Sequence, residues 1–145
     1  MPKTKIDLSI IIISLSTDKY HTKDSLDLTL KTLKPTLQKI KSEVILVDNS
    51  TIDDGTHSLA KSYFPEVKYI KRDEVYGFGD NNNFGLKYAS GRYVLFLNND
   101  VKFLDNKVLN EMVGWMDKNF EFGASTCSLI NSDEKTLQGT GGSFP

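Results

Sequence analysis

The sequence predicts an α/β fold with a mostly parallel sheet flanked by helices. Short apolar runs of strand length alternate with segments whose apolar residues recur at helical spacing, which is the pattern of successive strand–helix–strand units. The runs are rich in β-branched and aromatic residues, as is typical of parallel strands buried on both faces. Two of the runs stop abruptly at short polar residues, at the position where open α/β sheets bind ligands.

The expected elements can be placed in order along the chain. Strands are expected over residues 9–15, 44–47, 67–70, 93–97 and 124–130. Helices are expected over residues 26–40, 58–63 and 108–116, and a further helix begins in the asparagine-rich stretch 80–83 and stops at Gly91. Pro35 interrupts the first helical pattern and is expected to kink or restart that helix.

Length and composition limit the classes of function. A chain of 145 residues with 39% hydrophobic residues fits a single domain, which we assign to residues 1–145. The formal net charge of -1 gives no basic face, so we expect no nucleic-acid partner. The single cysteine, Cys127, allows no intramolecular disulfide, and we interpret it as a buried core thiol in a reducing, cytoplasmic compartment.

Membrane and dinucleotide signals are weak. No segment approaches the roughly 20 apolar residues of a membrane span, and we interpret residues 8–15 as the first strand, with peripheral contact at the inner membrane face left as an alternative. Gly77, Gly79 and Gly85 lack the spacing of the dinucleotide-binding fingerprint, and the Walker spacing is absent from the sequence. We therefore expect neither a nicotinamide enzyme nor a P-loop enzyme.

Polar residues gather at the predicted carboxyl edge of the sheet. They come from three loops that follow strands, residues 14–16, 48–50 and 98–100, and from the polar stretch 80–83. Asp48 can accept hydrogen bonds from a base or a ribose hydroxyl. Asp100 and Asn98 offer the hard oxygen atoms that suit Mg²⁺ or Mn²⁺, and a divalent ion there would neutralise a diphosphate leaving group. On these residues alone, a plain turn at residues 98–100 is an equal alternative.

Four segments carry a resemblance to a known family: SIIIISLST (9–17), VDNSTIDDGT (47–56), GFGDNNNFGLKYASGRYVLFLNNDV (77–101) and LINSDEKTLQGTGG (129–142). They resemble the N-terminal half of a family 2 glycosyltransferase with the GT-A fold. The likeness runs from Leu8 to about Phe144. It is most similar to the rhamnosyltransferase-like branch, in which an Asn-x-Asp sequence such as Asn98-Asn99-Asp100 commonly replaces Asp-x-Asp.

The resemblance implies roles for the polar residues of this edge. Asp48 contacts the nucleobase or ribose, and Asp100 is the ligand of Mg²⁺ or Mn²⁺, with Asn98 in the place of the first carboxylate. The implied nucleotide-binding residues are Ser14, Ser16, Asp48, Asn49, Asn82, Asn83, Asn98 and Asn99. The alternatives are structural: a helix cap for Asn83, and turn roles for Asp54 and Asn98.

The chain also departs from the family pattern. Val75 stands where the family usually has Asn, and Ser16 stands where Asn is common. Family 2 catalytic domains are longer, and their acceptor-side half supplies the general base, so we interpret this chain as truncated, with that base outside it. Asp133 and Glu134 are acidic and late, but they lie in a predicted turn and we do not expect either to be the base.

The resemblance implies transfer of a sugar from a nucleotide diphosphate sugar to a hydroxyl acceptor, metal-assisted and inverting, in polysaccharide or cell-surface glycan assembly. The acceptor is expected to be a glycan or a lipid-linked molecule. The alternative is a non-catalytic sugar-nucleotide-binding module, or a fragment that lacks the general base. A half domain exposes apolar surface that favours self-association, so we expect a homo-oligomer.

Overall fold

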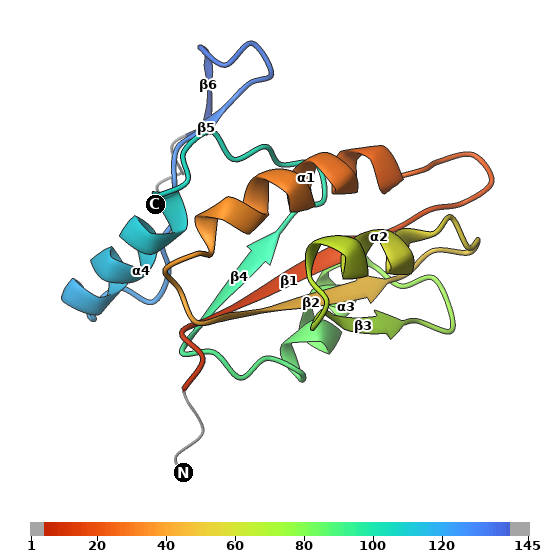
Figure 1. Cartoon of the computed structure of the whole chain (residues 1–145), viewed down its shortest axis with the longest axis horizontal. Coiled ribbons are helices and arrows are strands. Elements are labelled where there is room, and N and C mark those ends of the chain that lie inside the picture. Colours follow the sequence, from red (N-terminus) through yellow and green to blue (C-terminus); the bar gives the residue numbers. More distant parts are fainter. Residues whose placement is uncertain (1–4, 140–145) are drawn as a thin grey trace, which may run out of the picture.

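The computed structural model describes residues 5–139 of the chain. Its centre is a four-stranded parallel sheet in the order β3-β2-β1-β4 (Figure 1), which confirms the predicted fold class. The strands are β1 (Leu8–Ser14), β2 (Ser42–Asp48), β3 (Lys68–Lys71) and β4 (Tyr93–Leu97). The parallel pairing runs across the whole of this sheet, because β1 pairs with both β2 and β4, and β2 pairs with β3.

Helices cover both faces of the sheet. Helices α1 (Lys23–Thr36) and α2 (Thr56–Tyr63) lie over one face, and α3 (Phe78–Leu86) lies over the other (Figure 1). Helix α4 (Val108–Lys118) contributes Leu109 to the core beneath α1. Successive side chains of β1 point to opposite faces of the sheet. Ile10 and Ile12 therefore pack on the side of α1 and α2, whereas Ile11 and Ile13 pack on the side of α3.

Helix α3 packs close to the sheet at Gly85. A Cβ atom added there would lie 2.7 Å from Ile11 Cγ2 and 3.1 Å from Val47 Cγ2. Those distances are shorter than ordinary carbon–carbon contact, so the close approach of helix and sheet requires glycine. Because α3 follows the polar segment after β3, this packing also fixes where that segment crosses the carboxyl edge.

Two helices differ from the sequence prediction. Helix α1 ends at Thr36, one residue after Pro35, and does not continue to Ile40. Pro35 has no backbone N–H to donate to the preceding turn, and the helix ends one residue after it. Helix α3 begins at Phe78, earlier than predicted, and ends at Leu86, before Gly91.

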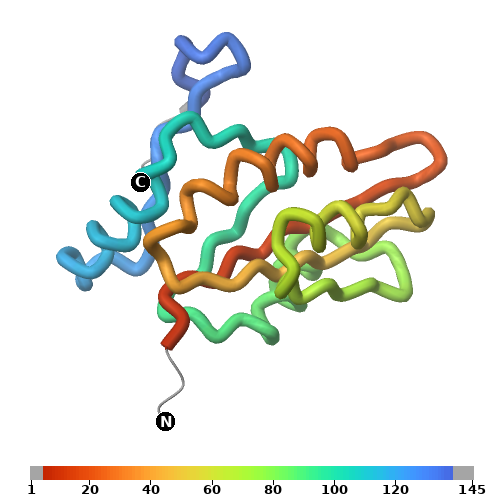
Figure 2. The backbone as a smooth tube through the Cα atoms, in the orientation of Figure 1, coloured from red at the N-terminus to blue at the C-terminus, as the bar shows by residue number. Residues whose placement is uncertain are grey.

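The predicted fifth strand over residues 124–130 is wrong as a member of the parallel sheet. Only Leu129–Ile130 is extended in a ladder, as β5, and it pairs antiparallel with β6 (Leu137–Gly139) in a separate hairpin (Figure 2). An extended segment becomes a strand only where a neighbour supplies backbone partners, and residues 123–128 are not paired with β4. Cys127 in this segment is half-buried, so its prediction as a core thiol is also wrong.

Strand β4 is an edge strand in the described part of the chain, paired with β1 on one side. Its sequence, YVLFL, carries no charge, and Phe96 is 51% exposed.

No helix within residues 5–139 has both the length and the apolar character that a membrane span requires.

Candidate functional site

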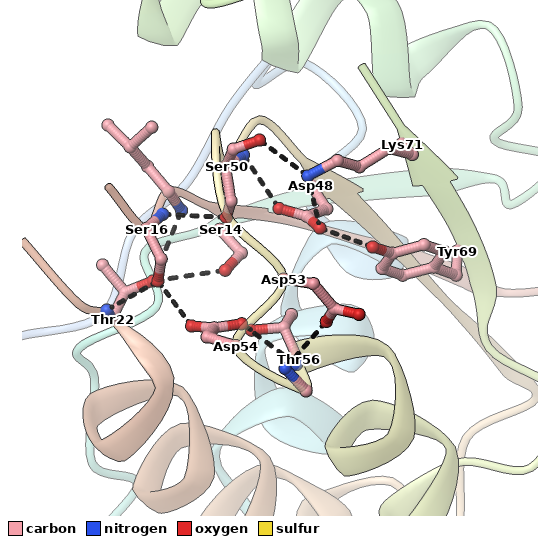
Figure 3. A network of polar contacts seen from close by, with 12 residues as sticks. Ser14, Ser16, Thr22, Asp48, Ser50, Asp53, Asp54, Thr56, Tyr69 and Lys71 are labelled. Atoms are coloured by element: carbon pink, nitrogen blue, oxygen red, sulfur yellow. Dashed lines mark hydrogen bonds and ion pairs between the residues drawn. The ribbon is translucent and has the colours of Figure 1, made fainter. Parts of the chain in front are cut away.

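The carboxyl ends of β1, β2 and β3 form one row across the sheet. In the strand register, Ser14 lies beside Asp48, and Asp48 lies beside Lys71. The side chains of the last two meet, with Lys71 Nζ 3.1 Å from Asp48 Oδ2 (Figure 3). This is the edge at which parallel α/β sheets bind ligands. Two of the three predicted polar loops, those after β1 and β2, begin in this row, and its third member, Lys71 of β3, was not predicted.

Asp48 accepts hydrogen bonds at both carboxylate oxygens. The Ser50 backbone N–H donates to Oδ1 at 2.9 Å, and the Tyr69 hydroxyl and Lys71 ammonium donate to Oδ2. Asp48 is 4% exposed. Burial alone would raise the pKa of Asp48, but the hydrogen bonds from Ser50, Tyr69 and Lys71 lower it below its ordinary value. The carboxylate is therefore ionised at neutral pH.

Tyr69 joins Asp48 to the start of α2. Its ring stacks on the His57 imidazole, with centroids 4.1 Å apart and planes 15° apart. Burial and the hydrogen bond to Asp48 raise the pKa of Tyr69, so the phenol stays protonated and donates. Lys71 has a second acceptor in the Ser50 carbonyl oxygen, 2.6 Å from Nζ.

A second network ties the loops after β1 and β2 to the start of α1 (Figure 3). The Ser16 backbone N–H donates to Ser50 Oγ at 2.8 Å, and the Ser16 hydroxyl donates to Asp54 Oδ2 at 2.5 Å. The Thr22 backbone N–H donates to Ser16 Oγ at 3.2 Å, and the hydroxyls of Ser14 and Thr22 share a hydrogen bond of 3.2 Å. Ser14 and Ser16 are both buried.

Asp54 begins α2. Its Oδ1 atom accepts from the Thr56 backbone N–H at 3.1 Å and from the Thr56 hydroxyl at 2.6 Å. Gly55 between them has a φ angle of 81°, a left-handed conformation that favours glycine. Burial would raise the pKa of Asp54, but the bonds from Ser16 and Thr56 lower it. Asp54 thus has a turn role, and it also holds Ser16.

Asn49 directs its side chain toward the segment between β3 and α3. Its Nδ2 atom donates to the Tyr76 carbonyl at 3.1 Å, and its Oδ1 atom accepts from the Tyr76 N–H at 3.2 Å. In the same segment, the Arg72 guanidinium lies 3.8 Å from the Tyr76 ring centroid and 3.9 Å from that of Phe84. The segment is therefore held against both the end of β2 and the side of α3.

The three asparagines of α3 have different environments. Asn81 is 1% exposed and donates from Nδ2 to the Tyr76 carbonyl at 3.1 Å. Asn82 is 8% exposed and donates to the Phe78 carbonyl at 2.9 Å. Asn83 is exposed and lies inside the helix, which begins after the Gly77 cap, so the cap role for Asn83 is wrong.

The end of β4 is more open than the end of β2. Asn99 donates from Nδ2 to the Ile13 carbonyl at 2.8 Å and so joins the ends of β4 and β1. Asn98 and Asp100 on either side of it are both exposed. The residues predicted to meet a metal ion are therefore on the far side of β1 from Asp48.

The donor set fits a metal site that a ligand completes. Within residues 5–139, no group of three His, Cys, Asp or Glu side chains converges as a cage. Asp100 nevertheless supplies an accessible carboxylate, and Asn98 lies two positions before it. Mg²⁺ is commonly held by one or two carboxylates together with substrate phosphates and water. Asp48 is a poor ligand by comparison, because protein donors already engage its oxygens.

Sequence reasoning missed several residues that build this edge. Tyr69 and Lys71 lie two positions apart on β3 and so share a face; the register places Lys71 beside Asp48, and the Tyr69 hydroxyl reaches the same carboxylate from its place beside Leu46. That spacing was a usable signal, since a polar pair with period two beside a strand ending in aspartate indicates a buried polar cluster. Thr22 and Arg72 gave no such signal, because their roles depend on how two loops return to the sheet.

Comparisons with known proteins agree with this geometry. Residues 9–140 match the family model described as Glycosyl transferase family 2. The chain is 34% identical over 100 residues to the O-antigen biosynthesis protein RfbC of Myxococcus xanthus, covering 68% of this chain and 8% of RfbC. It is 29% identical over 102 residues to WfaP of Escherichia coli, named a UDP-Glc:alpha-D-GlcNAc-diphosphoundecaprenol beta-1,3-glucosyltransferase, covering 70% of this chain and 40% of WfaP.

Solved structures share the fold. S. aureus TarS superposes with a TM-score of 0.66 at 23% identity, covering 79% of this chain and 20% of TarS. The mannosyltransferase PcManGT of Pyrobaculum calidifontis, solved with GDP-Man and Mn2+, superposes with a TM-score of 0.64 at 21% identity, covering 79% of this chain and 33% of PcManGT. These likenesses confirm the GT-A fold, and this chain spans less than half of RfbC and WfaP. Because residues 9–140, most of this chain, match the family model, the chain belongs to glycosyltransferase family 2.

Proposed function

We propose that this chain forms the donor-binding part of an enzyme that moves a sugar from a nucleotide diphosphate sugar to a hydroxyl acceptor, with inversion and with metal assistance. The observation that carries the proposal is the placement of Asp48 and Asp100 at the carboxyl ends of β2 and β4, on either side of β1, in a family 2 domain. One carboxylate is buried and the other is open, so the two suit different parts of the donor.

The nucleoside is assigned to the β2 side of the edge. Asp48 is held ionised, and its Oδ1 atom accepts one protein hydrogen bond, which leaves a lone pair for a base or ribose donor. Ser14 and Ser16 lie in the adjoining network, and Ser16 stands beside the same loop. Asn82 and Asn83 come from α3 on the opposite face of the sheet and complete the proposed nucleotide contacts.

The diphosphate is assigned to the β4 side of the edge. Asp100 and Asn98 would hold Mg²⁺ or Mn²⁺ there, since both side chains are exposed at the strand end. A bound divalent ion would supply charge neutralisation to the departing diphosphate. Asn99 positions this turn through its bond to Ile13. The Asn98-Asn99-Asp100 sequence is also our reason for proposing the rhamnosyltransferase-like branch.

An inverting transfer needs a general base that takes the proton of the acceptor hydroxyl as the hydroxyl attacks. Among the described residues we assign no such base. Asp133 lies in the β5–β6 turn and accepts from Lys135 and Thr136, and Glu134 pairs with Lys102. This observation favours the second candidate function, a sugar-nucleotide-binding module without turnover, or a fragment whose base lies elsewhere.

The acceptor class follows from the relatives. RfbC is named for O-antigen biosynthesis, and the name of WfaP contains a diphosphoundecaprenol-linked acceptor. We therefore propose a glycan or lipid-linked acceptor and a role in polysaccharide or cell-surface glycan assembly. Transfer to a lipid-linked acceptor suits a location at the cytoplasmic side of a membrane, with peripheral contact.

Exposed aromatic residues, among them Phe96 and Phe120, support the further proposal of a homo-oligomer.

Calorimetric titration with UDP, dTDP and GDP, each with and without Mn²⁺, tests the proposal. We expect one nucleotide to bind with an affinity that increases when Mn²⁺ is present. Absence of binding for all three nucleotides to a folded sample would contradict the donor site. If a nucleotide binds, a transfer assay with the matching sugar donor and a lipid-linked acceptor separates the enzyme from the binding module.

A further inference from the structure

The segment that crosses from β3 to α3 is fastened at both of its ends to the end of β2. We define residues 72–77 as the β3–α3 strap. The Arg72 backbone N–H donates to the Asp48 carbonyl at 2.8 Å, which continues the pairing of the two strands. Four residues later, Tyr76 exchanges two hydrogen bonds with the Asn49 side chain. The strap is thereby fixed relative to the strand end that carries Asp48.

Asn49 acts here as a substitute for a strand residue. Its amide accepts from the Tyr76 N–H and donates to the Tyr76 carbonyl, as a backbone peptide group does in a hydrogen-bonded strand pair. Asn49 is 2% exposed, so water does not compete strongly for these bonds. Because Asn49 follows Asp48 directly in the chain, its orientation and that of the carboxylate are coupled.

Asn81 donates to the same Tyr76 carbonyl from the other side, at 3.1 Å. Its own Oδ1 atom is buried without a hydrogen-bond partner among the described residues, as is Nη1 of Arg72. A buried carbonyl oxygen without a partner destabilises the folded state. The amide at position 81 is therefore not the side chain that stability alone would favour, and its remaining contact is the bond to Tyr76.

We propose that Asn49 and Asn81 are positioning residues that clamp the Tyr76 carbonyl and so hold the β3–α3 strap beside the donor site. Through the strap they hold Arg72, whose guanidinium lies between the rings of Tyr76 and Phe84. This inference rests on the proposed function, since the site to be positioned is the nucleoside side of the edge. It gives Asn49 a role in orientation where the sequence suggested a direct contact.

Hydrogen exchange and nucleotide titration on the full chain test the clamp. The variants are Asn49→Ala, Asn81→Ala and the double variant, with Asn110→Ala on the exposed face of α4 as the matched control. In Asn81→Ala we expect amide exchange in the strap to accelerate roughly tenfold, as the loss of one hydrogen bond predicts. The midpoint of thermal unfolding should stay the same or rise, because the orphaned Oδ1 atom is removed as well.

The double variant gives the sharper result. Each single variant leaves the Tyr76 carbonyl one amide donor, whereas the double variant leaves none, so the effect of both on strap exchange should exceed the product of the single effects. Affinity for the nucleotide that binds the unsubstituted chain should fall in the same order. Asn110→Ala should change neither quantity.

Different results would contradict the proposed donor site and the proposed positioning role of Asn49 and Asn81. If the unsubstituted chain binds no nucleotide, the donor site is wrong, and the positioning role is wrong with it. If it binds and the variants bind equally well while the strap exchanges faster, the clamp is only structural and the positioning role is overturned. Unchanged exchange of the strap in the double variant overturns the clamp itself.

Discussion

Lys71 lies beside Asp48 in the register of β2 and β3, and its Nζ atom is 3.1 Å from the Asp48 carboxylate. Tyr69, two positions earlier on the same strand, donates to the same oxygen. A single edge strand thus supplies two donors that keep a buried carboxylate charged before any ligand arrives. The proposed donor site is therefore organised by the sheet register, and its properties should respond to changes on β3.

Replacing Tyr69 with phenylalanine should destabilise the protein at neutral pH. The variant keeps the ring that stacks on His57 and loses the hydroxyl that donates to Asp48. Hydrogen bonds to charged groups contribute about 1.5–3 kcal/mol, and we expect the lower end because Lys71 and Ser50 remain. Urea unfolding measures the loss, and Tyr20→Phe, at an exposed ring, is the control.

The same variant gives a pH dependence with a defined sign. The pKa of Asp48 is lower in the folded protein than its ordinary value, so the charge on Asp48 stabilises the fold above about pH 4, and this contribution disappears as the pH falls through the folded pKa. The difference between the parent chain and Tyr69→Phe should therefore shrink below pH 4. A difference of constant size from pH 7 to pH 3 would show that the hydroxyl acts independently of the carboxylate charge.

Two glycines of α3 should respond oppositely to alanine. Gly85→Ala places a methyl group 2.7 Å from Ile11 Cγ2, and overpacking of this kind costs about 1–3 kcal/mol of unfolding free energy. Gly79→Ala meets nothing within 4 Å and gains helix propensity, so it should stabilise by up to about 1 kcal/mol. The midpoints of thermal unfolding of Gly85→Ala and Gly79→Ala, each compared with the parent chain, measure the two effects. Equal destabilisation of both variants would contradict the close packing of α3.

Ser9→Ala should raise the pKa of Glu43. Burial would raise that pKa, but hydrogen bonds from Lys68, Ser9 and Ser90 lower it to about 2. Ser9 Oγ donates to Glu43 and accepts from the backbone N–H of Gly91 at 2.8 Å, so its loss removes one donor and leaves a partly buried N–H. Carbon-detected NMR titration of the Glu43 carboxyl group measures the shift. An unchanged titration would mean that Ser9 contributes little to this cluster.

Asp100→Ala should remove metal-dependent nucleotide binding while the fold stays intact. The side chain is exposed, so its loss removes no core contact. We expect the affinity for the nucleotide in Mn²⁺ to fall by about tenfold or more, since even outer partners of metal ligands have effects of that size. Calorimetry in Mn²⁺ and in EDTA, with circular dichroism for the fold, measures this. Glu66→Ala, also exposed, is the control, and retained Mn²⁺ dependence in Asp100→Ala would refute the metal assignment.

The core strands were predictable because each is a continuous apolar run with a clear polar end. A continuous apolar run such as Ile10–Ile13 is stable only in a strand that is buried on both faces of the sheet. Residues 124–130 resembled a strand by composition, yet pairing is a property of two segments and the composition of one cannot supply it. The start of α3 was placed too late because glycines and asparagines at its beginning have low helix propensity, and packing on the sheet overrides it.

At the site, sequence reasoning located strand ends but not the partners of each side chain. That Asp48 and Ser14 share an edge follows from strand order. That the Asn49 side chain is occupied by Tyr76, and Ser16 by Asp54, depends on the return paths of loops, which no periodic pattern encodes. Asn82 shows the same limit, because the residue type does not indicate that its Nδ2 atom donates to the Phe78 carbonyl one turn earlier in the helix.

The outer side of β4 bears on how the protein behaves at high concentration. In the described part of the chain, this strand has backbone partners on one side, and its five residues include no charge, no proline and no bulge to discourage another strand from adding to it. A lysine placed at Phe96, whose side chain is half-exposed, would act as a gatekeeper against intermolecular β-sheet growth. Preparations of this chain should therefore be kept dilute, or carry that substitution, when aggregation competes with ligand binding.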